Sequence, residues 1–199
     1  MTNQVAIELK KYPVTMGLII LSCLVSLMTW FGSVESTLIW FVYDRDAILH
    51  GQVWRLITPI FLHFPAIGII FAHLAFNMIW LYQFGYLIER CDSSKWLLII
   101  VVISGIVSNA AQAFVSPYVL FGGMSGVVYA LLGYLFLLKK LDPYYLGRVP
   151  DNIIYFLIGF MVIATLGVFG AIANTAHIVG FIVGLLFAAV RHFARADSR

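Results

Sequence analysis

The sequence predicts an all-α membrane protein with six transmembrane helices, organised as a single polytopic domain over residues 1–199. Hydrophobic residues make up 62% of the chain and charged residues only 11%, and the mean hydropathy is +0.99. A soluble domain of this length is not so apolar, and no second, soluble domain fits beside the apolar segments. Polar links separate these segments, which predict spans at residues 14–31, 66–88, 96–115, 125–138, 153–170 and 171–190.

The basic residues predict how the spans are oriented. If the N-terminus is cytoplasmic, ten of the twelve Lys and Arg residues face the cytoplasm, and only Arg45 and Arg55 face outward. The opposite orientation would reverse that ratio, so the positive-inside rule places both termini in the cytoplasm. The basic residues are dispersed along the chain, and a net charge of +3 is therefore no signal for nucleic-acid binding.

The outward stretch after the first span, residues 32–65, is here called the outer loop. It is too long for a tight connection and too apolar for a solvated one. Aromatic residues of this kind favour the bilayer interface, and the outer loop carries Trp40, Phe41, Tyr43, Trp54, Phe61 and Phe64. His50 and His63 in the outer loop, and His192 in the C-terminal tail, are expected to be surface or interfacial residues.

The fourth span is too short to cross a bilayer. A helix from Ser125 to the charged pair Lys139-Lys140 rises only about 21 Å, whereas the hydrocarbon core is about 30 Å thick. Its first turn must therefore start inside the membrane, and the glycine-containing stretch 116–124 must dip in to reach it. Irregular backbone is tolerated at this depth only where protein buries it or where it lines a watered cavity. A serine at such a place indicates chemistry.

Four polar residues fall at one depth in the outer half of the bilayer. Counted from the cytoplasmic ends of their helices, Ser125 and His177 each lie about 21 Å deep, while His73 and Asn77 lie about 24 Å and 18 Å deep. His73 and Asn77 are four residues apart and so share one face of a helix. Polar and ionisable groups inside a membrane are costly and are functional candidates by default.

This set of residues suits hydrolysis by a serine nucleophile, which needs a base to take its proton and donors for the oxyanion. His177 is the candidate base for Ser125, and His73 and Asn77 are candidate oxyanion donors beside the N–H groups of the helix N-terminus. The pairing of Ser125 with His177 rests on the small residues that predict contact between the fourth and sixth spans, namely Gly126, Ala130, Gly133, Ala176, Gly180 and Gly184. All nine carboxylates fall outside the spans, so a Ser–His dyad is expected.

Other functions remain open at this point. His73 and His177 at one depth would also suit a haem-binding or metal-binding membrane protein, although such a protein has no need of the Ser–Gly turn. A small transporter would need charged groups near the midplane, and the predicted spans carry none. The sequence has no His-Glu-x-x-His motif, no paired membrane aspartates and no membrane lysine base, and no cofactor is expected. Cys23 and Cys91 lie at different depths and are not expected to form a disulfide.

Five short motifs occur in a fixed order along the chain. They are Val53-Trp54-Arg55, His73-Leu74-Ala75-Phe76-Asn77, Glu89-Arg90, Gly123-Met124-Ser125-Gly126 and Ala176-His177-Ile178-Val179-Gly180. Together they resemble the motifs of the rhomboid intramembrane serine proteases of the compact bacterial six-helix type, and the resemblance covers about residues 11–191. It implies a rhomboid bundle with Ser125 as nucleophile, His177 as general base, and His73, Asn77 and the Ser125 amide as oxyanion hole.

The resemblance has further implications for packing and partners. Tyr129 would pack against the His177 ring, and Arg55 would anchor the outer loop. Substrates would be single-span proteins of the cell inner membrane, which enter beside the second and fifth spans and are cut within or near their transmembrane segments. A catalytically silent relative that binds clients is the remaining alternative, but such members usually lose the Ser or the His.

The chain departs from this pattern in two respects. The loop between Trp54 and His73 is a few residues longer than in the compact bacterial members. A cytoplasmic domain before the first span, and regulation through one, are not expected.

Overall fold

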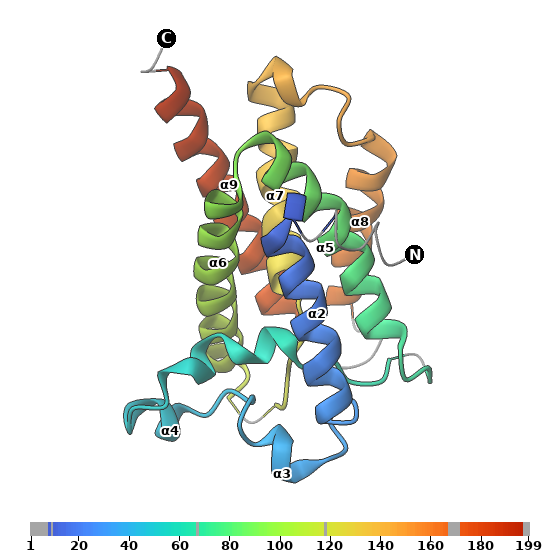
Figure 1. The fold of residues 1–199 in the computed structure, drawn as a ribbon, viewed down its shortest axis with the longest axis vertical. Helices are drawn as coiled ribbons and strands as arrows, with labels where there is room; N and C mark the ends of the chain where they lie inside the picture. The colour runs from blue at the N-terminus through green and yellow to red at the C-terminus, as the bar shows by residue number, and fades with distance from the viewer. Residues whose placement is uncertain (1–7, 9, 67, 118, 167–171, 197–199) are drawn as a thin grey trace.

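The computed structural model describes residues 8, 10–66, 68–117, 119–166 and 172–196. Within these residues the chain is helical and has no strand, apart from an isolated bridge between Ala66 and Ile69. The long helices are α2 (Pro13–Met28), α5 (Ala72–Cys91), α6 (Ser94–Val115), α7 (Ser125–Leu141), α8 (Asp151–Thr165) and α9 (Asn174–Ala196) (Figure 1). The short helices are α3 (Glu35–Leu38), α4 (Arg45–Leu49), η1 (Val53–Leu56), η2 (Thr58–Phe61) and η3 (Pro143–Tyr145). The chain thus forms an all-α bundle, the class that its sequence predicts.

Among the described residues, two helices are long and apolar enough to cross a membrane, judged by length and composition. They are Ser94–Val115 and Asn174–Arg195, each of 22 residues, and each rises about 33 Å. The helices Pro13–Met28 and Asp151–Thr165 are also apolar but are shorter.

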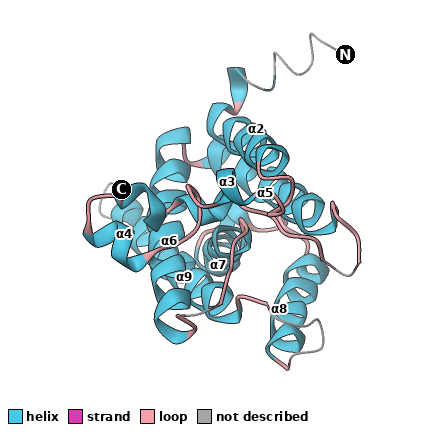
Figure 2. Cartoon of the chain, turned by 90° about the horizontal axis from the view of Figure 1, so that it is seen from below, coloured by secondary structure: helices cyan, strands magenta, loops and turns pink. Residues whose placement is uncertain are grey.

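Helix α7 occupies the middle of the bundle, and the other long helices surround it (Figure 2). Its closest partner is α9, because glycines let the two backbones approach. A Cβ atom added at Gly180 or Gly184 of α9 would overlap the carbonyl oxygen of Gly126 or Ala130 of α7. A Cβ at Gly133 of α7 would likewise overlap the carbonyl oxygen of Phe181. The small residues therefore place α9 directly against α7.

The outer loop folds into α3, α4, η1 and η2 at one end of the bundle (Figure 1). Arg55 is only 6% exposed, and its guanidinium donates hydrogen bonds to the backbone carbonyls of Ile39 and Val42 and to Gln52. These hydrogen bonds connect η1 to the residues just before it and to the segment that follows α3. Trp54 is exposed, as an interfacial residue would be, but Phe61 is buried in the core.

Glu89 joins the end of α5 to the start of α2. Its carboxylate accepts hydrogen bonds from the backbone N–H of Val14 at 3.0 Å and of Thr15 at 2.9 Å, and from the Thr15 hydroxyl at 2.6 Å. The first N–H groups of a helix have no acceptor within the helix, and a negative charge there interacts favourably with the helix dipole. Glu89 therefore caps α2 from a neighbouring helix and sets the position of one against the other.

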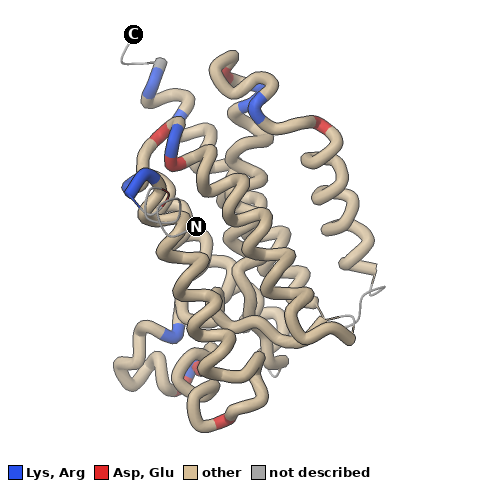
Figure 3. Tube along the Cα trace, turned by 45° about the vertical axis from the view of Figure 1, so that its right-hand side comes forward, with Lys and Arg blue, Asp and Glu red and all other residues tan. Residues whose placement is uncertain are grey.

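A buried carboxylate connects the helices at the end of the bundle opposite the outer loop. Asp92, whose side chain is fully buried, pairs with Arg191 at 2.8 Å and Arg195 at 2.9 Å, and accepts hydrogen bonds from the hydroxyls of Tyr134 and Tyr145. Burial raises the pKa of Tyr145, which keeps its hydroxyl protonated as a donor. Most of the Lys and Arg residues drawn in Figure 3 gather at this end, and few lie at the outer-loop end.

Some helix ends differ from those expected from hydropathy. Helix α5 begins at Ala72 and not at residue 66, because Ala66 and Ile69 form two backbone hydrogen bonds with each other and Gly68 has a φ of +72°. Helix α2 ends at Met28 and not at residue 31, because Trp30 and Phe31 take positive φ values of 44° and 54°. The expected junction between the last two spans falls on residues 167–171, which lie outside the described residues.

Candidate active site

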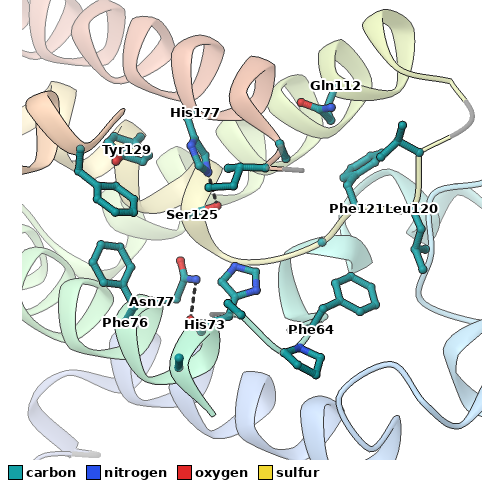
Figure 4. Close-up of a pocket in the computed structure, with 18 residues that line it drawn as sticks. Phe64, His73, Phe76, Asn77, Gln112, Leu120, Phe121, Ser125, Tyr129 and His177 are labelled. Carbon is teal, nitrogen blue, oxygen red and sulfur yellow. Dashed lines mark hydrogen bonds between the residues drawn. The ribbon is translucent and has the colours of Figure 1, made fainter. Parts of the chain in front are cut away.

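Ser125 and His177 meet in a cavity between the helices. Ser125 is the first residue of α7, and its Oγ atom lies 2.7 Å from Nε2 of His177 in the first turns of α9. The cavity has a volume of about 540 Å³ and is lined mainly by apolar side chains. His73 and Asn77 from α5 line it too (Figure 4). All four residues that the sequence singles out thus border one space.

Glycines before Ser125 allow the backbone to lie close to side chains of the outer loop and of α5. Gly123 has a φ of +120°, which L side chains rarely adopt. A Cβ there would also lie 2.6 Å from Nε2 of His73, and one at Gly122 would lie 2.7 Å from the Leu62 side chain. The first glycine of the Gly-x-Ser-Gly motif, Gly123, is therefore explained by the close approach of a side chain as well as by its backbone conformation.

His177 is held by its helix and by neighbouring side chains. The residue is 4% exposed, and its ring lies against that of Tyr129, with centroids 4.8 Å apart and planes inclined at 38°. The Tyr129 hydroxyl in turn donates to the carbonyl oxygen of Leu157 in α8. Nδ1 of His177 is buried and has no hydrogen-bond partner among the described residues. A serine and a neutral histidine at this distance can transfer a proton from Oγ to Nε2.

His73 and Asn77 lie on the side of the cavity opposite His177 (Figure 4). The Asn77 side chain is fully buried, and its Nδ2 donates to the backbone carbonyl of His73 at 2.9 Å. A side-chain amide has a second N–H, which remains for a ligand in the cavity. The two residues are one helical turn apart on α5, so both can face a group bound at Ser125.

Two residues near the site were not selected from the sequence as functional candidates. Gln112 in α6 lines the cavity and accepts a hydrogen bond from the backbone N–H of Ala176, next to His177. A polar residue in a predicted span was the available signal for Gln112. The expectation that His63 is a surface or interfacial residue is wrong, since it is 1% exposed and contacts both the Met124 backbone and the His73 ring.

The remaining histidines and the cysteines lie away from the cavity. His50 is exposed and bonds to the backbone carbonyl of Asp46, and His192 lies near the end of α9. Cys23 and Cys91 are both free thiols. No three His, Cys, Asp or Glu side chains come together as a metal site in the described part of the chain.

The sequence of this chain is similar to those of known proteins of one family. Residues 50–193 match the Rhomboid domain. The chain is 38% identical over 182 residues to the rhomboid protease GlpG of Salmonella paratyphi A and to that of Salmonella typhi, an alignment that covers 89% of this chain and 63% of each relative. It is 37% identical over 158 residues to the rhomboid protease GlpG of Salmonella newport, covering 78% of this chain and 55% of that relative. The chain belongs to the rhomboid family, and it spans about three fifths of the length of these curated relatives.

Proposed function

We propose that this chain is an intramembrane serine endopeptidase, which cleaves transmembrane segments of other membrane proteins through a Ser125–His177 dyad. The observation that carries the proposal is the 2.7 Å contact between Ser125 Oγ and His177 Nε2 inside a largely apolar cavity. An apolar cavity excludes competing water and strengthens the electrostatic interactions within it. Membership of the rhomboid family, whose relatives above are named proteases, supports the same reaction.

The proposed reaction follows from the positions of these atoms. Ser125 Oγ attacks the scissile carbonyl carbon while its proton passes to His177 Nε2, which gives a tetrahedral intermediate and an imidazolium. The imidazolium then returns that proton to the leaving amine nitrogen, the C–N bond breaks, and an acyl-enzyme remains. Water, deprotonated by His177, hydrolyses the ester and restores Ser125. Every proton transfer in this scheme uses the same atom, Nε2 of His177, which must therefore face Ser125 Oγ throughout.

The oxyanion in this scheme is assigned to donors across the cavity from His177. The Ser125 N–H is at the start of α7, where the first N–H groups have no acceptor within the helix. The free N–H of Asn77 and the ring of His73 face the same space. Donors preset around developing charge lower the barrier without reorganising during the reaction.

The bilayer arrangement is part of the proposal. Six spans cross the cell inner membrane, with Ser125 inside the bilayer at the start of a short fourth span and the outer loop at the interface. Ten of twelve basic residues then face the cytoplasm together with both termini. Protease accessibility of tags at the two termini, in intact and in broken membrane vesicles, tests this orientation. Tags that are cut from the outer side of the membrane would reverse it.

A cleavage assay tests the proposed activity. Purified wild type and Ser125→Ala, reconstituted separately into liposomes, are incubated with a panel of single-span membrane proteins. We expect wild type to cut at least one of them within or near its transmembrane segment and Ser125→Ala to cut none. Equal cleavage by both proteins would overturn the nucleophile assignment. If neither cuts any substrate and wild type fails to react with a fluorophosphonate, a catalytically silent client-binding protein becomes the better description.

The haem-binding or metal-binding alternative has its own test. His73 and His177 border the same cavity, so an axial-ligand role would require both imidazoles to face a bound group. A visible absorbance spectrum of the protein purified from membranes distinguishes the two functions. We expect no haem band, and a stoichiometric band lost in both His73→Ala and His177→Ala would favour the alternative.

A further inference from the structure

His63 links three parts of the molecule that are far apart in sequence. Its Nδ1 atom lies 3.2 Å from the Ser26 hydroxyl in α2 and 3.1 Å from the carbonyl oxygen of Phe61. Its Nε2 atom accepts a long hydrogen bond of 3.4 Å from the backbone N–H of Met124, the residue before Ser125. The ring is also edge-on to that of His73, with centroids 5.2 Å apart.

These contacts determine which nitrogen of His63 carries hydrogen. A nitrogen that accepts from the Met124 N–H has no hydrogen of its own, so the proton is on Nδ1, where the oxygens of Ser26 and Phe61 can both accept it. Burial lowers the pKa of His63 to about 3, and the ring is therefore neutral at physiological pH. In this tautomer both ring nitrogens are satisfied, as a buried polar side chain requires.

The outer loop also binds the preceding amide. The N–H of Gly123 donates to the carbonyl oxygen of Pro59 at 2.9 Å. Pro59 and His63 thus engage the two N–H groups that precede Ser125 in the chain. The next N–H groups belong to the first turn of α7, which offers them no acceptor of its own. The outer loop therefore decides which backbone donors are left to face the cavity.

We propose that His63 is a positioning residue, which fixes the backbone at Met124 so that the Ser125 N–H is directed at the oxyanion. The inference rests on the proposed protease function. The peptide plane that carries the Met124 N–H is separated from the one that carries the Ser125 N–H by a single Cα atom. Rotation of the first plane would therefore move both the Ser125 amide and its Oγ. The His63 ring also packs edge-on against the His73 ring and so helps to fix the position of His73.

Two substitutions separate positioning from simple packing. The amide of His63→Gln reaches the place of Nε2 and can accept from Met124, whereas the shorter amide of His63→Asn reaches only the place of Nδ1. We expect His63→Asn to react with a fluorophosphonate at Ser125 about tenfold more slowly than wild type. It should also cleave substrate with a lower kcat and an unchanged KM. His63→Gln should recover most of both rates.

Ser26→Ala is the matched control, because it removes a neighbour of Nδ1 without touching the Met124 contact. It should lower the Tm in detergent but leave the labelling rate of Ser125 near that of wild type. The same Tm measurement establishes that each His63 variant is folded at the assay temperature. If a folded His63→Gln variant reacts with the fluorophosphonate about tenfold more slowly than wild type, the proposal is contradicted, whatever the result for His63→Asn.

Backbone hydrogen exchange gives a readout that does not depend on activity. We expect the Met124 amide to exchange faster in His63→Asn than in wild type and His63→Gln. Equal exchange in wild type and His63→Asn, with equal labelling, would overturn the role of His63 while leaving the protease function intact. If wild type neither labels nor cleaves, the protease function fails. The exchange rates would then still show whether His63 holds the Met124 backbone.

Discussion

His177 has two ring nitrogens in very different situations. Nε2 is bonded to Ser125, while Nδ1 is buried with no hydrogen-bond partner in the described part of the chain. In the tautomer that can accept the serine proton, Nδ1 carries the hydrogen. The Tyr129 ring, whose centroid lies 4.8 Å from that of His177, could stabilise the imidazolium of the proposed reaction.

The pH dependence of activity follows from this proton transfer. His177 must be neutral to accept the Ser125 proton, so the cleavage rate should fall as the pH is lowered and imidazolium accumulates. The measurement is kcat/KM across acidic to alkaline pH, with a substrate for which the chemical step limits the rate. A flat profile under those conditions would contradict His177 as the base and leave the serine assignment untouched.

His73 and Asn77 on α5 are the proposed oxyanion donors, and their removal should change kcat and not KM. Asn77→Ala and His73→Ala should lower kcat by up to about 100-fold to 1000-fold with little change in KM, because donors aimed at developing charge act only in the transition state. Ser125 should still react with a fluorophosphonate in both variants, though more slowly. Kinetics in one detergent with saturable substrate test this. A raised KM with unchanged kcat would assign the pair to substrate binding.

The four proposed site residues could be chosen from the sequence because helical rise alone gives their depth. Counting from charged helix ends needs no tertiary information, and the chosen side chains border one cavity. His63 could not be chosen in this way. It lies in the outer loop, where spacing predicts no depth, and its role depends on contacts with α2 and with the backbone before α7.

The pairing of α7 with α9 is the feature that brings Ser125 and His177 together at the level of elements. Gly180→Leu should move the helices apart, because its side chain would meet the Gly126 carbonyl. We expect loss of cleavage together with a lower Tm. Gly17→Leu in α2 is the control, since nothing lies within 4 Å of a Cβ there, and it should retain activity and stability. If the two variants had equal cleavage activity and equal Tm, the close contact between α7 and α9 would have no role in positioning the site.

The ion pairs around Asp92 should stabilise the other end of the same helices. Asp92→Asn removes the carboxylate that pairs with Arg191 and leaves Arg195 its pair with Asp142, and breaking a buried pair costs about 3 kcal/mol. Asp151→Asn breaks a pair in which the carboxylate is 68% exposed, and the expected cost is below about 1 kcal/mol. Thermal unfolding of both variants tests this difference. An Asp92→Asn protein as stable as Asp151→Asn would contradict it.

Helix order was easier to predict than helix ends. In the described part of the chain, each of the predicted apolar segments overlaps one long helix, and the order is the same. Residues 66–71 are as apolar as a span, however, and hydropathy cannot separate the turn at Gly68 from the helix that begins at Ala72. The Asp92 ion pairs likewise join residues about a hundred positions apart, which no local pattern reveals.

At the scale of the whole molecule, the outer loop and the helix bundle have complementary parts in the site. The bundle places Ser125 against His177, through the close approach of α7 and α9. The outer loop holds the backbone before Ser125 through Pro59 and His63. Glu89 and Asp92, at the end of α5, tie that helix to α2 and to α9. We propose that this arrangement makes one serine, Ser125, a nucleophile.

Reaction with a fluorophosphonate, followed by mass-spectrometric mapping, tests that claim most directly. The probe is added to wild type, Ser125→Ala, His177→Ala and Ser104→Ala, the last a buried serine of α6 bonded to its own helix. Wild type and Ser104→Ala should carry the adduct on Ser125 and cleave substrate, while Ser125→Ala and His177→Ala should do neither and yet keep a Tm near that of wild type. Labelling of another serine, or full cleavage by Ser125→Ala, would contradict the account.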